Sequence, residues 1–168
     1  MKIRRTALLG LLTAIALTIF MLEAQLPPPV PLPGVKLGLA NIVTVFAVFA
    51  LGPGEGALVL AARIFLGAVF GGNFSTLIYS GAGGLCAIAV TVALRRILRK
   101  NQLWVAGCLG AAAHNLGQVA AAAAVSDTAA VFYYLPVLLG LGLITGLFTG
   151  LCAQFLVNRG RLWKTILK

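Results

Sequence analysis

Six long runs of apolar residues, separated by short stretches rich in proline, glycine or basic residues, constrain this chain more than any other feature. A helix needs about 20 apolar residues to cross the hydrocarbon core of a bilayer, with a lower limit of about 17. Because a spanning segment must satisfy its own backbone hydrogen bonds, we expect each run to be helical. The sequence therefore predicts an all-α integral membrane bundle in a single domain over residues 1–168, with six transmembrane helices at about residues 7–24, 35–51, 57–70, 74–94, 103–125 and 132–157.

Composition argues against a soluble protein. Of the 168 residues, 61% are hydrophobic and only 10% are charged, whereas about a quarter of the residues in a soluble domain are charged. A soluble chain this short could not bury so much apolar surface, because most of the surface of a small domain stays exposed. We therefore expect lipid to surround the outer faces of the helices.

The formal net charge of +10 raises the question of a nucleic-acid partner, and the distribution of the basic residues argues against one. Eleven of the thirteen lie in three blocks, at residues 2–5, 95–100 and 159–168, outside or between the apolar runs. This is the positive-inside pattern of membrane proteins, whereas nucleic-acid binding needs a basic face on a folded domain. With six crossings, all three blocks fall on one side. We therefore expect a multi-pass protein of the bacterial plasma membrane with both termini in the cytoplasm.

Polar residues inside the apolar runs are the candidate functional residues, because they are costly in lipid unless they face protein, water or a ligand. Lys36 and Asn41 lie near the start of the second run, and Arg63 lies near the middle of the third. Glu55 is eight residues before Arg63, about 12 Å along one helix, which is too far for a direct pair. We favour Arg63 facing an interior cavity, where it can bind an anion; pairing with an acid from another helix or with carbonyl groups is the alternative.

The fourth and fifth runs supply the other polar candidates. Asn73 and Tyr79 flank the start of the fourth run, ahead of glycines that serve either close packing or local unwinding. In the alanine-rich fifth run, His114 and Gln118 are four residues apart and share a helix face, with Asn115 about 100° round from His114. We favour solute binding by these three side chains over a role limited to hydrogen bonding between helices, which polar residues also perform in membranes.

Two stripes of small residues predict close helix packing. Gly142, Gly146 and Gly150 repeat every four residues in the last run, and Gly10, Ala14 and Thr18 do so in the first. Such stripes let two helix backbones approach closely. The stripe in the first run could pack within this bundle or against a partner subunit, and the sequence does not decide between them.

Three motifs together resemble a known family. They are the segment PGVKLGLANI at residues 33–42, Arg63-Ile64 followed by Gly67, and HNLGQ at residues 114–118. The chain resembles the Gx transporter family, which is also labelled heptaprenyl diphosphate synthase component I and is similar to the six-helix S components of energy-coupling-factor (ECF) transporters. The resemblance implies a membrane subunit that binds a small solute for uptake, powered by a separate energy-coupling membrane subunit and ATPase subunits.

The synthase label implies a different role, that of a membrane accessory subunit. Elongation of a prenyl diphosphate needs clustered carboxylates to hold Mg²⁺, and Asp127 is the single aspartate of this sequence. The chain also lacks the phosphate-binding loop of an ATPase. Cys86, Cys108 and Cys152 are isolated from one another, so neither a disulfide framework nor a zinc site is indicated. We therefore expect no catalysis, cofactor or metal in this chain.

Overall fold

The computed structural model describes residues 2–27, 36–72 and 74–160, and all the regular structure in these ranges is helical. The elements are α1 (Lys2–Glu23), α2 (Asn41–Ala50), α3 (Pro53–Gly71), α4 (Ser75–Arg95), α5 (Leu103–Ser126), the 3-10 helix η1 (Ala129–Tyr134) and α6 (Leu135–Asn158). The predicted all-α class is confirmed. Five helical segments of this part of the chain are long and apolar enough to cross a membrane.

The second helix is much shorter than the span expected over residues 35–51. It has ten residues and begins only at Asn41, and residue 35 lies outside the described ranges. Gly38 has a φ of +78°, a left-handed conformation that glycine adopts without strain and that interrupts a helix. The amides of Gly38 and Leu39 donate to the side chain of Glu23 instead of to helical carbonyls. This local bonding keeps residues 38 and 39 out of the helix, so α2 begins later than expected.

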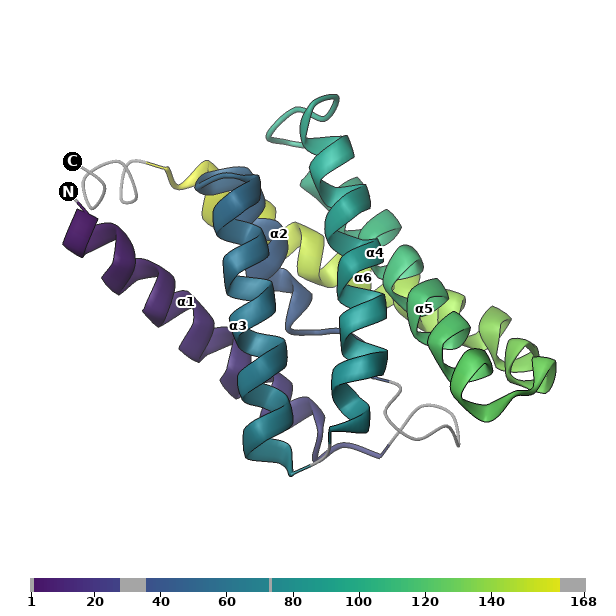
Figure 1. Cartoon of the computed structure of the whole chain (residues 1–168). Helices are drawn as coiled ribbons and strands as arrows, with labels where there is room; N and C mark the ends of the chain where they lie inside the picture. The colour runs from purple at the N-terminus through teal and green to yellow at the C-terminus, as the bar shows by residue number, and fades with distance from the viewer. Residues whose placement is uncertain (1, 28–35, 73, 161–168) are drawn as a thin grey trace.

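Despite its length, α2 lies at the centre of the molecule. It contacts each of the other five α-helices, and seven of its ten residues are buried. A helix that is apolar on all sides needs such an enclosed position. In Figure 1, α1 and α3 lie on one side of this short helix and α4 on the other, and α6 crosses behind it; α5 packs against both α4 and α6. The polar residues of α2 are therefore held inside the bundle.

The outer faces of the long helices carry large apolar side chains. Phe65, Phe70, Leu85, Ile144 and Phe148 are each between 61% and 68% exposed. Soluble monomers rarely show apolar patches of such extent. The fold is therefore that of a multi-pass membrane protein, with lipid as the solvent of these faces.

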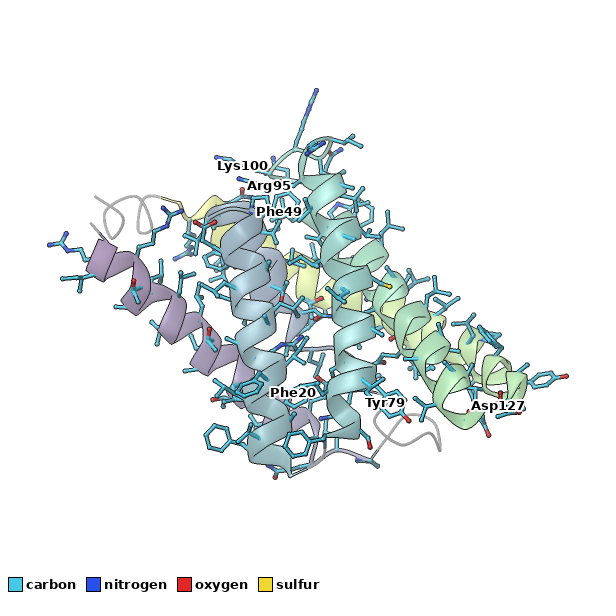
Figure 2. All side chains as sticks on the ribbon, in the orientation of Figure 1. Phe20, Phe49, Tyr79, Arg95, Lys100 and Asp127 are labelled. Carbon is cyan, nitrogen blue, oxygen red and sulfur yellow. The ribbon has the colours of Figure 1, made fainter. Side chains whose placement is uncertain are left out.

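The basic turn at residues 95–100 and the described ends of α1 and α6 lie at one end of the bundle. Arg95 and Lys100 mark the turn between α4 and α5, and α1 begins and α6 ends toward this same upper end of the view (Figures 1 and 2). Phe20, Tyr79 and Asp127 lie at the opposite end (Figure 2). This arrangement is the one that the distribution of basic residues predicts for an even number of crossings.

The glycine stripe of α6 packs tightly on α5. A Cβ atom added to Gly146 would lie 2.6 Å from the carbonyl oxygen of Gly107, and one added to Gly150 would lie 2.7 Å from the Cα of Trp104. Both distances are shorter than real Cβ contacts, so any larger residue would separate the two backbones. The predicted close packing of the last helix is confirmed.

The small-residue stripe of α1 behaves differently. Gly10, Ala14 and Thr18 are all exposed on the outer face of the helix, and a Cβ on Gly10 would meet no described atom within 4 Å. Within the part of the chain that the structure describes, the stripe is therefore not used to pack this bundle. A contact with a partner subunit, the other role that the sequence left open, stays a prediction.

Candidate functional site

Arg63 is an arginine enclosed within a membrane bundle. It lies in the middle of α3, and 2% of its surface is exposed. Its Nη2 donates to Asn41 Oδ1 on α2 over 3.5 Å, and its guanidinium carbon lies 5.7 Å from the ring centre of Phe20. A charged side chain at this depth costs several kcal/mol unless other groups compensate it. The surroundings of Arg63 therefore define the candidate site.

Glu23 is the acid that accompanies Arg63, and sequence reasoning missed it. It is the last residue of α1 and is only 6% exposed. Its carboxylate interacts electrostatically with Lys36 and with Arg63, although no direct ion pair joins it to either among the described residues. An acid from another helix, the alternative raised for Arg63, is therefore close enough to interact with its charge, but it does not form a direct ion pair among the described residues. Its position at the end of an apolar run, where an acid is rare, was the available signal.

The remaining acid near α3 serves a separate contact. Glu55 lies in the first turn of α3 and accepts a hydrogen bond from Arg5 of α1. This pair is at the start of α3, away from Arg63. The pair links α1 to α3, and Glu55 therefore does not compensate the charge of Arg63.

Lys36 forms the outer edge of the charged group. Its Nζ lies 3.6 Å from the ring centre of Phe20, a cation–π contact, and the side chain is only partly exposed. The pKa of Lys36 is lowered by burial and by Arg63, with Glu23 acting in the opposite direction. Lys36, a candidate from its place in the second apolar run, thus packs over Phe20 beside the other charges.

His114 and Gln118 project from one face of α5, as their spacing predicts. They are 3% and 0% exposed, and both meet α4 at Gly83, where an added Cβ would lie 2.9 Å from His114 Cε1 and 2.8 Å from Gln118 Cγ. On its other side, His114 meets Gly38, whose added Cβ would lie 3.4 Å from His114 Cδ2. Two glycines therefore make room for this imidazole between α4 and the segment that precedes α2.

The other predicted site residues are not all brought to this place. Asn115 turns toward α6, where its Nδ2 donates to the carbonyl oxygen of Leu138 over 2.5 Å. Tyr79 packs in an apolar cluster with Val119 and Leu138. Asn73 lies outside the described residues. The structure thus gathers Lys36, Asn41, Arg63 and His114 around Phe20 and Gly38, with Gln118 beside His114 at Gly83. Asn115 and Tyr79 have packing contacts instead.

Several polar atoms in this region have no hydrogen-bond partner among the described residues. Each buried group of this kind costs about 1–3 kcal/mol, and native proteins contain few of them. These atoms are Asn41 Nδ2, Thr44 Oγ1, Arg63 Nε, His114 Nδ1, Asn115 Oδ1, and Gln118 Nε2 and Oε1. Asn115 turns toward α6, and we call the other five residues the polar cluster: Asn41, Thr44, Arg63, His114 and Gln118.

The cavity at the polar cluster is small in this structure. Its volume of about 10 Å³ is roughly the space of one water molecule. The lining residues come from α2, α4, α5 and α6, and they are Asn41, Thr44, Val45, Ala87, Thr91, Gly107, Gly110, Ala111 and Thr149. Arg63, His114 and Gln118 are not among these residues, so the interior cavity expected beside Arg63 stays a prediction.

Comparison with known proteins places this arrangement in a family. A protein-family model described as heptaprenyl diphosphate synthase component I matches residues 12–156. The chain belongs to this family. The match to the heptaprenyl diphosphate synthase component I family covers every residue of the polar cluster as well as Glu23 and Lys36. This match confirms the family resemblance that the three sequence motifs indicated.

Neither of the other two comparisons returned a relative. No curated protein and no solved structure matches the chain. The likeness to the S components of ECF transporters therefore has no support beyond the sequence motifs. The family description itself points to the accessory-subunit interpretation.

Proposed function

We propose that this protein is a non-catalytic membrane subunit that binds a small anionic solute within its helical bundle. The observation that carries this proposal is the polar cluster around Arg63, whose donors and acceptors are buried but unpartnered. Stability alone would favour apolar side chains at these positions, because unpaired polar groups inside a protein are costly. A solute that supplies the missing partners explains why they are there.

The charges near the polar cluster favour an anion. Arg63 and Lys36 are two cations in a region where Glu23 is the one described acid, so one positive charge remains uncompensated. His114, Asn41 and Gln118 add groups that can hydrogen-bond to a polar solute. A bound anion would complete the charge balance of the site.

Family membership favours a role beside a prenyl diphosphate synthase. In this proposal a separate catalytic component carries the magnesium-binding carboxylates, and the present chain is its membrane accessory subunit. Asp127, the single aspartate, caps the C-terminal end of α5. It lies at the end of the bundle opposite to Arg95 and Lys100 (Figure 2). No group of three or more His, Cys, Asp or Glu side chains suited to a metal ion occurs among the described residues.

Uptake of the solute is the second candidate. The charged residues Glu23 and Lys36 lie with Phe20, at the end of the bundle opposite to the basic turn at Arg95 and Lys100. If the basic end is cytoplasmic, as the positive-inside pattern favours, the site opens toward the outside of a bacterial plasma membrane. An energy-coupling membrane subunit with ATPase subunits would then release the solute inward.

The exposed stripe of α1 supports a partner in either case. Gly10, Ala14 and Thr18 form a smooth outer face of the kind on which another transmembrane helix packs. Affinity purification from the native membrane identifies the partner: a soluble prenyltransferase supports the accessory role, and an energy-coupling subunit with ATPases supports uptake. If neither of these partners is recovered, the accessory role and the uptake role are both contradicted.

Solute binding itself is tested with variants of the polar cluster. Arg63→Ala and His114→Ala should lose a co-purified small molecule that native mass spectrometry detects on the wild-type protein. Arg5→Ala is the matched control, because it removes an arginine that bonds to Glu55 outside the cluster. If the two cluster variants retain the solute as the control does, the site is wrongly placed.

A further inference from the structure

The carboxylate of Glu23 is held by two successive backbone amides. Oε1 accepts from the Gly38 amide over 2.5 Å, and Oε2 accepts from the Leu39 amide over 3.1 Å. Each oxygen therefore has its own N–H donor. Successive amides next to a residue in the left-handed conformation, here Gly38 with a φ of +78°, form a concave site for an anion.

Two cations and two unused donors surround this pair of amides. Lys36 and Arg63 both interact electrostatically with the Glu23 carboxylate. Arg63 is 2% exposed and its Nε has no described partner; Asn41 is 8% exposed and its Nδ2 has none either. Asn41 Nδ2 lies within 2.9 Å of the position that a Cβ on Gly38 would take. The surroundings thus offer more positive charge and more donors than Glu23 uses.

We propose that the amides of Gly38 and Leu39, together with Lys36 and Arg63, form the binding site for a carboxylate group of the solute, and that Glu23 occupies this site when the solute is absent. The inference rests on the proposed solute-binding function and names the solute as a small carboxylate. A carboxylate is the group that fits, because the two amides already face the two oxygens of one.

The position of Glu23 allows it to leave this site. It is the last residue of α1, and the four residues after it, at positions 24–27, are all exposed. Rotation of this one side chain toward the end of the bundle would free both amides without moving α1. The solute and Glu23 then compete for the same donors, so Glu23 lowers the affinity for the solute while it holds the segment at residues 36–40 in place.

Chemical rescue tests the carboxylate site. Glu23→Ala removes the carboxylate, and acetate is the probe, with acetamide as its neutral counterpart. We expect about 100 mM acetate to raise the Tm of purified Glu23→Ala by about 3–6 °C, the shift that a dissociation constant of roughly 10 mM gives for a chain of this length. Acetamide should leave it unchanged, and acetate should not stabilise the wild-type protein or Glu55→Ala, the matched control. Equal effects of acetate and acetamide, or of acetate on both variants, would overturn the proposal, as would no effect of acetate on Glu23→Ala.

A second variant tests competition with the solute itself and does not depend on folding of the alanine variant. Glu23→Gln keeps the size of the side chain but removes its charge, so the fraction of protein that carries the co-purified solute in native mass spectra should rise at least twofold over wild type. A fraction that falls or stays equal, while Arg63→Ala still loses the solute, would overturn competition by Glu23 and leave the proposed function standing. If no form of the protein carries a solute, the proposed function fails, and the acetate experiment still decides whether the carboxylate site exists.

Discussion

Substitution of Gly83 by alanine tests the close approach of α4 to the His114 face of α5. A Cβ at this position would lie 2.8 Å from the backbone carbonyl oxygen of His114 and 2.8 Å from Gln118 Cγ. Ordinary van der Waals contact begins at 3.4 Å, so α4 and α5 would have to separate by roughly 0.6 Å. Overpacking of this kind costs about 1–3 kcal/mol, and a carbonyl oxygen cannot rotate away as a flexible side chain can.

Gly81 is the matched control for this experiment. It lies in the same helix, and a Cβ added to it would meet no described atom within 4 Å. Gly81→Ala should therefore stabilise the protein by about 0.5–1 kcal/mol through helix propensity alone. The two variants differ only in the neighbours that the new methyl group meets.

Thermal unfolding of the purified variants, followed by tryptophan fluorescence, measures the difference. A gap of about 2 kcal/mol between Gly83→Ala and Gly81→Ala corresponds to about 4–8 °C in Tm for a chain of this length. Gly83→Ala should also lose the bound solute, because the methyl group displaces His114 and Gln118. Equal Tm values for the two variants would refute the close packing of α4 on His114.

Three further substitutions separate binding from packing. Thr44→Val replaces an unpartnered buried hydroxyl by a methyl group, so the Tm in the absence of solute should stay equal or rise, and a clear fall would show that the hydroxyl has a partner. Asn115→Ala removes the hydrogen bond to the Leu138 carbonyl and should cost about 1–3 kcal/mol in unfolding experiments while the solute is retained; loss of the solute at unchanged stability would contradict this. Ala14→Leu on the exposed face of α1 should leave the Tm unchanged but reduce partner recovery in affinity purification, and full recovery would exclude the stripe as the contact.

The sequence was sufficient for the helical class because apolar run length and the spacing of basic residues report directly on membrane crossing. It was also sufficient for the shared face of His114 and Gln118, since residues four apart in a helix always lie on one side. The close packing of the glycine stripe of α6 followed from the same periodic argument, whereas its partner helix did not. Each of these features depends on local spacing alone.

The features that could not be predicted depend on contacts between distant segments. The late start of α2 at Asn41 results from hydrogen bonds of Gly38 and Leu39 to Glu23, which lies 15 and 16 residues before them in the sequence. The bond from Asn115 to Leu138 likewise depends on which helix lies beside α5. Periodicity tells which face of a helix a residue occupies, but not which neighbour covers that face.

The mass of the wild-type protein, released from its native membrane under non-denaturing conditions, tests the central claim most directly. The account predicts a population whose mass exceeds that of the chain by one small carboxylate-bearing molecule, and this excess disappears in Arg63→Ala but persists in Arg5→Ala. A wild-type protein that carries nothing but lipid, or a bound molecule that Arg63→Ala retains, would contradict solute binding at the polar cluster.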